Sequence, residues 1–309
     1  MDAGERELFA TAVESAVARG GDVDAALEEL GWADALVADE QTAVSVLFDA
    51  QGRAGVVSRA LDAVLAHALR APAASTVVLP AFGHTTAPGA LDGDTVTLAG
   101  LTTSGVSTDS SLVVPCGPIV VTVGGAGLTA RTVDGIDPAF GLVELTGSAT
   151  ATLSAPAGWT NALAAGQRAV AHQLVGASAR MLELAREHAL DRIQFGVPIA
   201  SFQAIRHKLA DTYVAIESAR TALDAAWEEP SAFNAAVAKA ITGRAARLAG
   251  KHCQQVLAGI GFTVEHPLHT YVRRVRVLDG LLGDSRTLTK QIGAQLLEAR
   301  GLPAILPLV

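Results

Sequence analysis

Apolar residues recur at every third or fourth position over the first part of the chain, which is the spacing of amphipathic helices. The apolar positions of the first two helices are Leu8, Val13, Val17, Leu27 and Leu30. Gly20-Gly21 separates these helices, and Asp22 or Asp24 can cap the second one. The stretch 42–69 continues the pattern but contains two glycines, which allows it to form two helices. We therefore expect a helical domain over residues 1–74.

The pattern changes to short runs of β-branched and apolar residues after this point. These runs are 76–79, 95–98, 112–114, 119–123 and 141–145. Gly, Pro, Asp and Ser separate them, which is typical of antiparallel strands joined by turns. The segment 91–94, Leu-Asp-Gly-Asp, fits a hairpin turn. These features predict a small antiparallel β domain over residues 75–154.

Helical spacing returns in the last part of the chain and is strongest there. Apolar faces run from Leu163 to Leu184, from Phe202 to Leu223, from Phe233 to Val256 and from Leu288 to Leu296. Pro198, Pro230 and Pro267 fall between these stretches, where helix breaks are expected. Four amphipathic helices with short connections predict an antiparallel bundle over residues 155–309. The expected fold class is α+β, with an N-terminal helical domain, a small central β domain and a C-terminal four-helix bundle.

Composition narrows the class of protein. Half of the 309 residues are apolar, which supplies a core and excludes a disordered chain. The net charge of −8 and the absence of a basic run argue against nucleic acid and against anionic membrane surfaces. Two cysteines exclude a disulfide framework and a cysteine-rich metal site. No apolar run approaches the roughly 20 residues of a membrane span, and the acidic first residues do not form a signal peptide, so we expect a soluble cytoplasmic protein.

Two motif candidates have ordinary structural explanations. The segment 125–130 fits the dinucleotide fingerprint G-x-G-x-x-[GA], in which a helix N-terminus must hold the pyrophosphate. The next residues, 131–138, are too few and too broken for that helix, so a glycine-rich turn is favoured. His266 and His269 have a spacing that a helical metal site could use, but Pro267 lies between them and favours a loop. We assign no metal ligand.

Two segments of the predicted bundle are more informative. The first, 192–203, reads R-I-Q-F-G-V-P-I-A-S-F-Q. The second, 255–262, reads Q-V-L-A-G-I-G-F and is followed by Glu265 and Pro267. Local chemistry alone would accept each segment as a helix that ends at a glycine.

Together and in this order, the two segments resemble motifs of the acyl-CoA dehydrogenase family. That family carries R-x-[QT]-F-G-x-P-[IL]-x-x-[FH]-Q between two helices of its C-terminal bundle, and later Q-x-x-G-G-x-G-[FY]-x-x-E-x-P. The resemblance covers residues 157–297 well, and the segment 27–32 is similar to the family's L-x-E-L-G-W. It implies the acyl-CoA dehydrogenase fold, FAD as the cofactor and α,β-desaturation of an acyl-CoA.

The resemblance also implies a set of cofactor-binding residues. In the family, FAD lies between the β domain of one subunit and the bundle of the next, and these motifs contact the neighbour's FAD. Carried over by motif, the contacts are Arg192, Phe195, Gln255 and Gly259. Ala258 replaces the first glycine of the G-G pair, where the backbone approach to FAD can differ.

The sequence departs from the family at both places where a catalytic carboxylate is found. Leu282 stands at the Glu of the E-G pair that follows the R-D-A-K segment, which here reads R-R-V-R over 273–276. Gly166 stands at the alternative position on the first bundle helix. Neither residue can accept a proton, so we assign no catalytic residue. The β domain also lacks the family's W-I-[TS] flavin contact, since the nearest stretch is 101–105, L-T-T-S-G.

This combination resembles the short non-catalytic subunit of actinobacterial heteromeric (α2β2) acyl-CoA dehydrogenases of steroid catabolism. The implied partners are a homologous catalytic subunit that carries the Glu, an acyl-CoA substrate, and electron-transfer flavoprotein as electron acceptor. Two alternatives stay open. The chain can be a non-enzymatic relative that binds a partner or acyl-CoA, or an independent enzyme that uses its glycine-rich β segment for a nucleotide.

Overall fold

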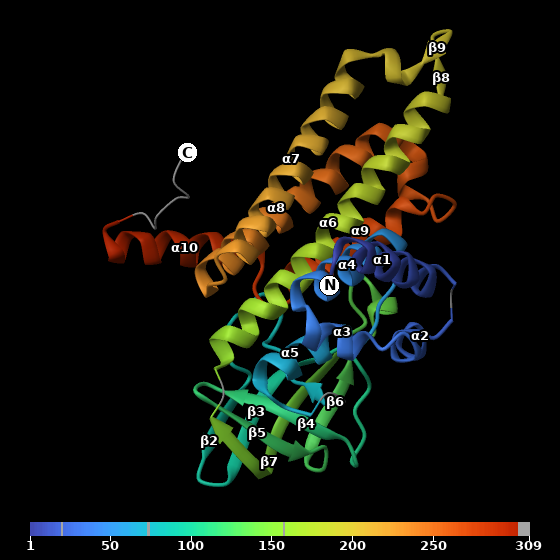
Figure 1. Cartoon of the computed structure of the whole chain (residues 1–309). Helices are drawn as coiled ribbons and strands as arrows, with labels where there is room; N and C mark the ends of the chain where they lie inside the picture. Colours follow the sequence, from blue (N-terminus) through green and yellow to red (C-terminus); the bar gives the residue numbers. More distant parts are fainter. Residues whose placement is uncertain (20, 73–74, 157, 302–309) are drawn as a thin grey trace.

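The computed structural model describes residues 1–19, 21–72, 75–156 and 158–301, and it has the expected acyl-CoA dehydrogenase-like order of helices, sheet and helices (Figure 1). The first helices are α1 (Ala3–Ala18), α2 (Val23–Glu29), α3 (Trp32–Ala38), α4 (Glu40–Ala54) and α5 (Ala60–Leu69). The predicted cap of α2 is confirmed, because the Asp22 carboxylate accepts the backbone N–H groups of Asp24 and Ala25. Gly55, with φ +70°, ends α4 and so divides the stretch 42–69 into two helices.

A curled seven-stranded sheet follows. Its strands are β1 (Thr76–Val77), β2 (Gly89–Asp92), β3 (Thr95–Thr102), β4 (Ser111–Cys116), β5 (Ile119–Gly124), β6 (Leu128–Thr132) and β7 (Val143–Pro156). The order is β1-β4-β5-β7-β3-β2, with β6 also paired to β7. The predicted hairpin at 91–94 is confirmed by the Asp92–Thr95 pairing and by φ +57° at Gly93. The expectation of a wholly antiparallel domain is wrong at one edge, where the short β1 runs parallel to β4.

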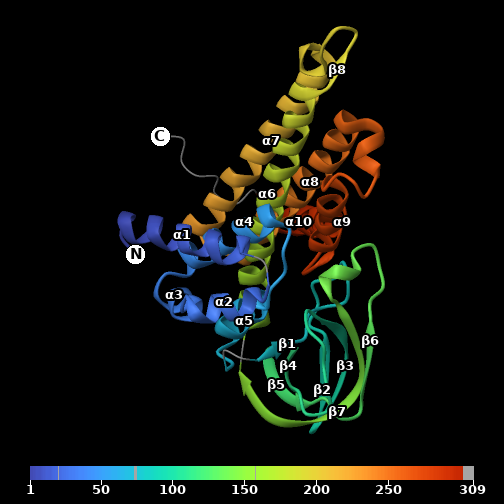
Figure 2. The same ribbon diagram turned by 90° about the vertical axis from the view of Figure 1, so that its right-hand side faces the viewer.

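The C-terminal part contains the four predicted helices and one more. They are α6 (Trp159–Asp191), α7 (Gln203–Glu228), α8 (Ala232–Leu257), α9 (Leu268–Gly280) and α10 (Ser285–Ala299). The helix that the pattern did not reveal is α9, where arginines interrupt the apolar spacing. Figures 1 and 2 show α6 and α7 rising together away from the sheet, and Figure 1 shows α10 projecting to one side.

Close helix packing depends on small residues where α4 crosses α6. A Cβ added to Gly52 would lie 2.2 Å from the backbone oxygen of Gln173, and one added to Gly176 would lie 2.2 Å from the backbone oxygen of Asp49. Each glycine therefore lets the two backbones approach within a distance that any side chain would prevent. This contact fixes the N-terminal helices against the middle of the long helix α6.

A single buried arginine connects all three parts of the chain. Arg274 lies on α9, and its guanidinium Nε donates to the Asp137 carboxylate at 2.5 Å, next to the short 3₁₀ helix η1 (Pro138–Phe140) of the β domain. Its NH1 group donates to the backbone oxygen of Gly55, at the end of α4, at 2.9 Å. The side chains of Arg274 and Asp137 are 4% and 5% exposed. Because both charges are buried, each one depends on the other for compensation.

A second polar connection joins α5 to the sheet. The Asp62 carboxylate accepts the backbone N–H of Val77 at 2.9 Å and the hydroxyl of Thr103 at 2.8 Å. Burial raises the pKa of Asp62 to about 6, although both hydrogen bonds act in the opposite direction. The loss of hydration therefore outweighs the two hydrogen bonds at this carboxylate.

We predict that Arg274→Ala lowers the free energy of unfolding by about 3–5 kcal/mol, because it leaves the Asp137 carboxylate buried without a partner. Chemical denaturation measures the effect. The neighbouring Arg273 is exposed, so Arg273→Ala is the matched control and should change stability by no more than about 0.5 kcal/mol. Equal effects of the two substitutions would contradict the assigned role.

We also predict a pH dependence from Asp62. Since the folded pKa is raised above the ordinary value of 3.8, the stabilising contribution is present below pH 4 and is lost as pH rises towards 6. Asp62→Asn keeps an acceptor for Val77 and removes the titration. The stability of the native chain relative to this variant should fall by roughly 3 kcal/mol between pH 4 and pH 7. A difference that is flat across this range would show that Asp62 titrates normally.

Candidate functional site

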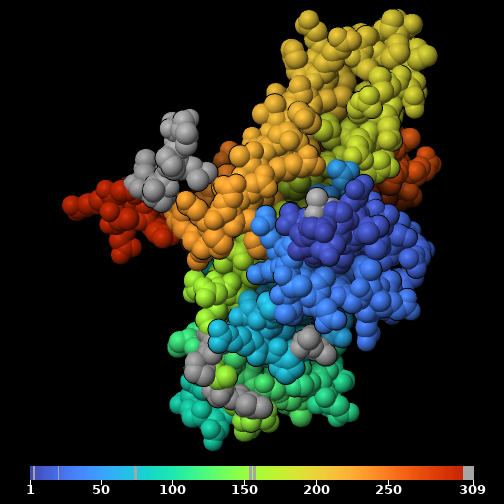
Figure 3. Space-filling view, in the orientation of Figure 1, coloured from blue at the N-terminus to red at the C-terminus, as the bar shows by residue number. Residues whose placement is uncertain are grey.

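The first motif forms the tip of the bundle. Arg192 ends α6, and the chain then turns through the hairpin of β8 (Ile193–Gln194) and β9 (Val197–Pro198) before η2 (Ile199–Ser201) and α7. Phe195 and Gly196 have φ +53° and +80°, two successive left-handed residues, as a tight two-residue hairpin requires. Figure 3 shows this tip projecting beyond the rest of the molecule.

The motif side chains at the tip face outwards. The Phe195 side chain is 92% exposed and lies edge-on to the Phe202 ring, at a centroid distance of 6.1 Å. Arg192 holds its backbone in place by accepting the N–H of Ile199 at 2.8 Å. Its guanidinium is exposed and, among the described residues, makes no hydrogen bond or ion pair. A cation and an aromatic ring are thus presented together to an external group.

The second motif lies where α8 ends. Gln255 is exposed on the last turn of α8, and the chain continues into η3 (Ala258–Phe262). Ala258 has φ +53° and ψ −131°, a conformation that glycine adopts far more easily. The backbone shape suited to the family's first glycine therefore occurs here although the residue is alanine. A Cβ added to Gly259 would meet no atom within 4 Å, so its backbone is open to an approaching ligand.

The structure places the two motifs at the same end of the bundle without joining them. Burial lowers the pKa of His266, and the nearby charge of His188, four residues before Arg192, lowers it further. The start of α9 and the end of α6 therefore lie close together. Within the described part of the chain, no hydrogen bond links Arg192 or Phe195 to Gln255 or Gly259.

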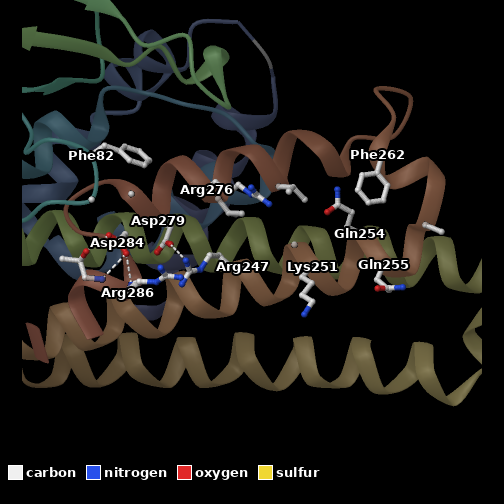
Figure 4. A pocket seen from close by; sticks show the side chains of 18 residues that line it. Phe82, Arg247, Lys251, Gln254, Gln255, Phe262, Arg276, Asp279, Asp284 and Arg286 are labelled. Carbon is white, nitrogen blue, oxygen red and sulfur yellow. Dashed lines mark hydrogen bonds and ion pairs between the residues drawn. The ribbon is translucent and has the colours of Figure 1, made fainter. Parts of the chain in front are cut away.

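A groove begins at the second motif and runs along the bundle between α8 and α9. Its volume is 1040 Å³. Gln255, Ala258 and Phe262 line one end, and Phe82 and Asp284 line the other (Figure 4). The sequence pattern does not reveal this groove, because arginines interrupt the apolar spacing of α9.

The two positions where the family carries its catalytic carboxylate meet in the core. A Cβ added to Gly166 would lie 2.6 Å from Cδ1 of Leu282 and 2.9 Å from Cδ2 of Leu65. Leu282 is 1% exposed, and its backbone oxygen accepts from the Gln167 amide at 2.9 Å. The place of the base is therefore filled by packed apolar side chains. It offers neither a proton acceptor nor space for a substrate carbon.

The loop between β1 and β2 packs against the end of α9 and the residues next to Leu282. The backbone N–H of Gly83 donates to the Gly280 oxygen at 2.8 Å, and the Phe82 ring lies so close to Gly280 that an added Cβ would be 2.0 Å from it. Trp159 donates its indole N–H to the Thr85 oxygen at 3.0 Å. The end of the groove at Phe82 is thus bounded by contacts between the β domain, α6 and α9.

The two threonine hydroxyls of the stretch 101–105 have partners within the chain. Thr102 is fully buried and donates to the Ser104 oxygen at 2.8 Å. Thr103 donates to the Asp62 carboxylate. The hydroxyl groups of both threonines are therefore committed to internal contacts, which leaves them poorly placed to hold a flavin in this chain's own β domain.

The glycine-rich segment and the histidine pair have structural roles. The glycine-rich segment 125–130 turns from β5 into β6, so no helix follows to bind a pyrophosphate. The expected loop at His269 is wrong, because His269 lies in the first turn of α9, and its Nδ1 contacts the His266 oxygen at 2.8 Å.

Over the described ranges, no three His, Cys, Asp or Glu residues gather as a metal site would require. Nor does any helix in those ranges have the length and apolar character needed to cross a membrane.

A set of cations that was not predicted from the sequence lies beside the groove. Arg247, Lys251, Arg276 and Arg286 line the groove between α8 and α9. Arg244, Arg247 and Lys251 also line a smaller groove of 490 Å³ between α7 and α8. The spacing of three and four residues along α8 was the available signal, since it places these three cations on one helical face.

The bundle matches a domain of known proteins. Residues 158–297 match the family described as acyl-CoA dehydrogenase, C-terminal domain. The acyl-CoA dehydrogenase IpdE2 of Mycobacterium tuberculosis is 33% identical over 171 residues, which cover 55% of this chain and 53% of that protein. The chain therefore spans about half the length of this curated relative.

Two solved structures share the fold over nearly the whole chain. The Tcur3481-Tcur3483 steroid ACAD aligns with a TM-score of 0.75 at 22% identity and 96% coverage of each chain. The ChsE4-ChsE5 complex from Mycobacterium tuberculosis aligns with a TM-score of 0.75 at 20% identity, covering 98% of this chain and 99% of that one. These alignments extend the fold assignment from the bundle to the N-terminal helices and the sheet. Residues 158–297 therefore form an acyl-CoA dehydrogenase C-terminal domain, and the chain as a whole has the acyl-CoA dehydrogenase fold, in a family whose members are FAD-dependent flavoproteins.

Proposed function

We propose that this chain is the non-catalytic subunit of a heteromeric acyl-CoA dehydrogenase that desaturates an acyl-CoA between its α and β carbons. The observation that carries the proposal is the contact between Gly166 and Leu282, which fills the place of the base with core side chains. A chain without a proton acceptor there requires another subunit to remove the α-proton. In this assignment the bundle of the chain completes the FAD site of that partner.

The exposed residues at the bundle tip fit FAD chemically. A guanidinium without an internal partner suits the pyrophosphate, to which it can donate two hydrogen bonds. The exposed Phe195 ring suits a planar nucleotide ring, and Gln255 and the open backbone at Gly259 supply polar contacts. When bound, FAD supplies the hydride acceptor for the β-hydrogen. The four residues of this chain bind and orient it, and they move no proton.

The two-protein complexes with a similar fold support a heteromeric assignment. One of them, the ChsE4-ChsE5 complex, pairs two named proteins, and the other is a steroid ACAD. We therefore propose an α2β2 assembly, a steroid-derived CoA ester as the candidate substrate, and electron-transfer flavoprotein as the electron acceptor. Capturing the chain from its source organism and identifying a co-purifying homologue would test the partnership. Recovery of the chain without any homologue would count against it.

We predict that Arg192→Ala weakens flavin retention by the complex about 10- to 100-fold, the scale of a charged hydrogen bond. Flavin absorbance after gel filtration measures retention, and thermal unfolding measures stability. Arg186 is an exposed arginine on the same helix and outside the motif, so Arg186→Ala is the matched control. Full flavin occupancy in Arg192→Ala, or an equal loss in the control, would exclude a direct contact with the cofactor.

We predict that the catalytic carboxylate lies in the partner. Replacing the partner's Glu at the position of Leu282 or of Gly166 with Gln should abolish turnover by the complex. In this chain, Glu265 is the carboxylate of the second motif, and Glu265→Gln should cost less than about 100-fold, the scale of one general base. A larger loss from any carboxylate of this chain, with folding intact, would contradict the division of roles.

A further inference from the structure

Five cations gather on one face of an acidic chain. Arg244, Arg247 and Lys251 follow one face of α8, Arg276 faces them from α9, and Arg286 lies in the first turn of α10. The whole chain has a net charge of −8. We call these five residues the basic face. Figure 4 shows four of them along the groove, between Phe82 at one end and Phe262 at the other.

Four of the five cations have no internal partner. In the described part of the chain, the side chains of Arg244, Lys251, Arg276 and Arg286 make no ion pair and no hydrogen bond. Arg247 alone is engaged, since it donates to the Ser285 hydroxyl at 2.7 Å and lies 3.6 Å from the Asp279 carboxylate.

The acidic groups that line the groove are already committed. Asp279 is 4% exposed and accepts the backbone N–H of Ser285. Asp284 caps α10 by accepting from Arg286 and Thr287, and these hydrogen bonds lower its pKa against the opposing effect of burial. Among the described residues, neither carboxylate forms an ion pair with the four free cations.

The groove is continuous with the proposed FAD surface. Gln255, Ala258 and Phe262 form its far end, so a partner whose FAD is held there would lie next to the groove. A groove between two helices is shaped to receive the ridge of side chains on a third helix. The exposed, unpaired cations would be complemented by carboxylates on such a helix.

We propose that the basic face docks an acidic helix of the catalytic partner, and that its charge favours the heteromer over self-association. The proposal rests on the function proposed above. Opposite charges across an interface set partner choice and speed association, whereas like charges facing one another are unfavourable. Two copies of this chain that met through the same face would place one set of cations against the other. An acidic partner surface removes that repulsion.

The small number of lysines allows a direct test. The chain contains four lysines, Lys208, Lys239, Lys251 and Lys290, and Lys239 is fully buried. A water-soluble carbodiimide joins an amine to a carboxylate only when the two are in contact. Treating the purified complex should give a cross-link, found by mass spectrometry, between Lys251 and an Asp or Glu of the partner. Lys251→Arg should keep the complex and abolish that cross-link.

Charge reversal tests whether the cations of the basic face strengthen binding to the partner. Arg244→Glu with Lys251→Glu should weaken the complex at least tenfold at low salt, and the loss should shrink at 0.5 M salt, where surface charges are screened. Arg19→Glu with Arg70→Glu is the matched control, since both arginines are exposed on the N-terminal helices and the net charge changes equally. The control should leave affinity within a factor of about two, the scale of a remote surface change.

The outcomes separate the two proposals. A complex that forms but shows no Lys251 cross-link, or that tolerates the charge reversal as well as the control, overturns the docking site and leaves the proposed function standing. Failure to find any homologous partner overturns both. Free nucleotide that competes with the partner for the basic face, with no Lys251 cross-link, would show that the groove binds a small anionic ligand instead.

Discussion

The buried pair of Arg274 and Asp137 is the interaction on which the arrangement of the three parts depends. Arg274 belongs to the bundle, Asp137 to the β domain, and the Gly55 oxygen that completes the contact belongs to the N-terminal helices. The arginine stands where the family's R-D-A-K segment carries an aspartate. The charge on α9 is therefore reversed, and the opposite charge is supplied by the loop before η1. Since both side chains are almost fully buried, each charge is compensated by the other. The pair forms only when the bundle, the β domain and the N-terminal helices keep these relative positions.

This arrangement of the three parts has opposite consequences at the two ends of the bundle, which are the near end beside the sheet and the far end at the tip. At the near end it presses Phe82 against Gly280 and leaves Leu282 packed against Gly166, so the position of a catalytic base becomes core. At the far end the same rigid helices carry Arg192 and Phe195 into solvent, where they have little to hold within their own chain. Under the proposed function, the packed end supplies no base, and the exposed end supplies groups for the FAD of a partner.

Features that depend on a few neighbouring residues could be predicted from the sequence, whereas features that depend on contacts between distant segments could not. Helical spacing and the Asp22 cap are set within a few residues, and the motifs at Arg192 and Gln255 sit at helix ends, so these features were predictable. Helix α9 was not, because its outward arginines and the inward Arg274 interrupt the apolar spacing, and only the fold shows that Arg274 is buried against Asp137. The parallel pairing of β1 and the contact of Gly166 with Leu282 join distant segments, which no local pattern encodes. The basic face has the same origin, since it combines residues of three helices.

The central claim is that this chain supplies part of a flavin site and no active centre of its own. Light scattering combined with flavin absorbance on a single chromatographic peak tests this most directly, because it gives mass and cofactor content together. The expected result is a colourless protein when the chain is alone, and two FAD per α2β2 assembly when the partner is present. A monodisperse, flavin-loaded homotetramer of this chain alone would contradict the account.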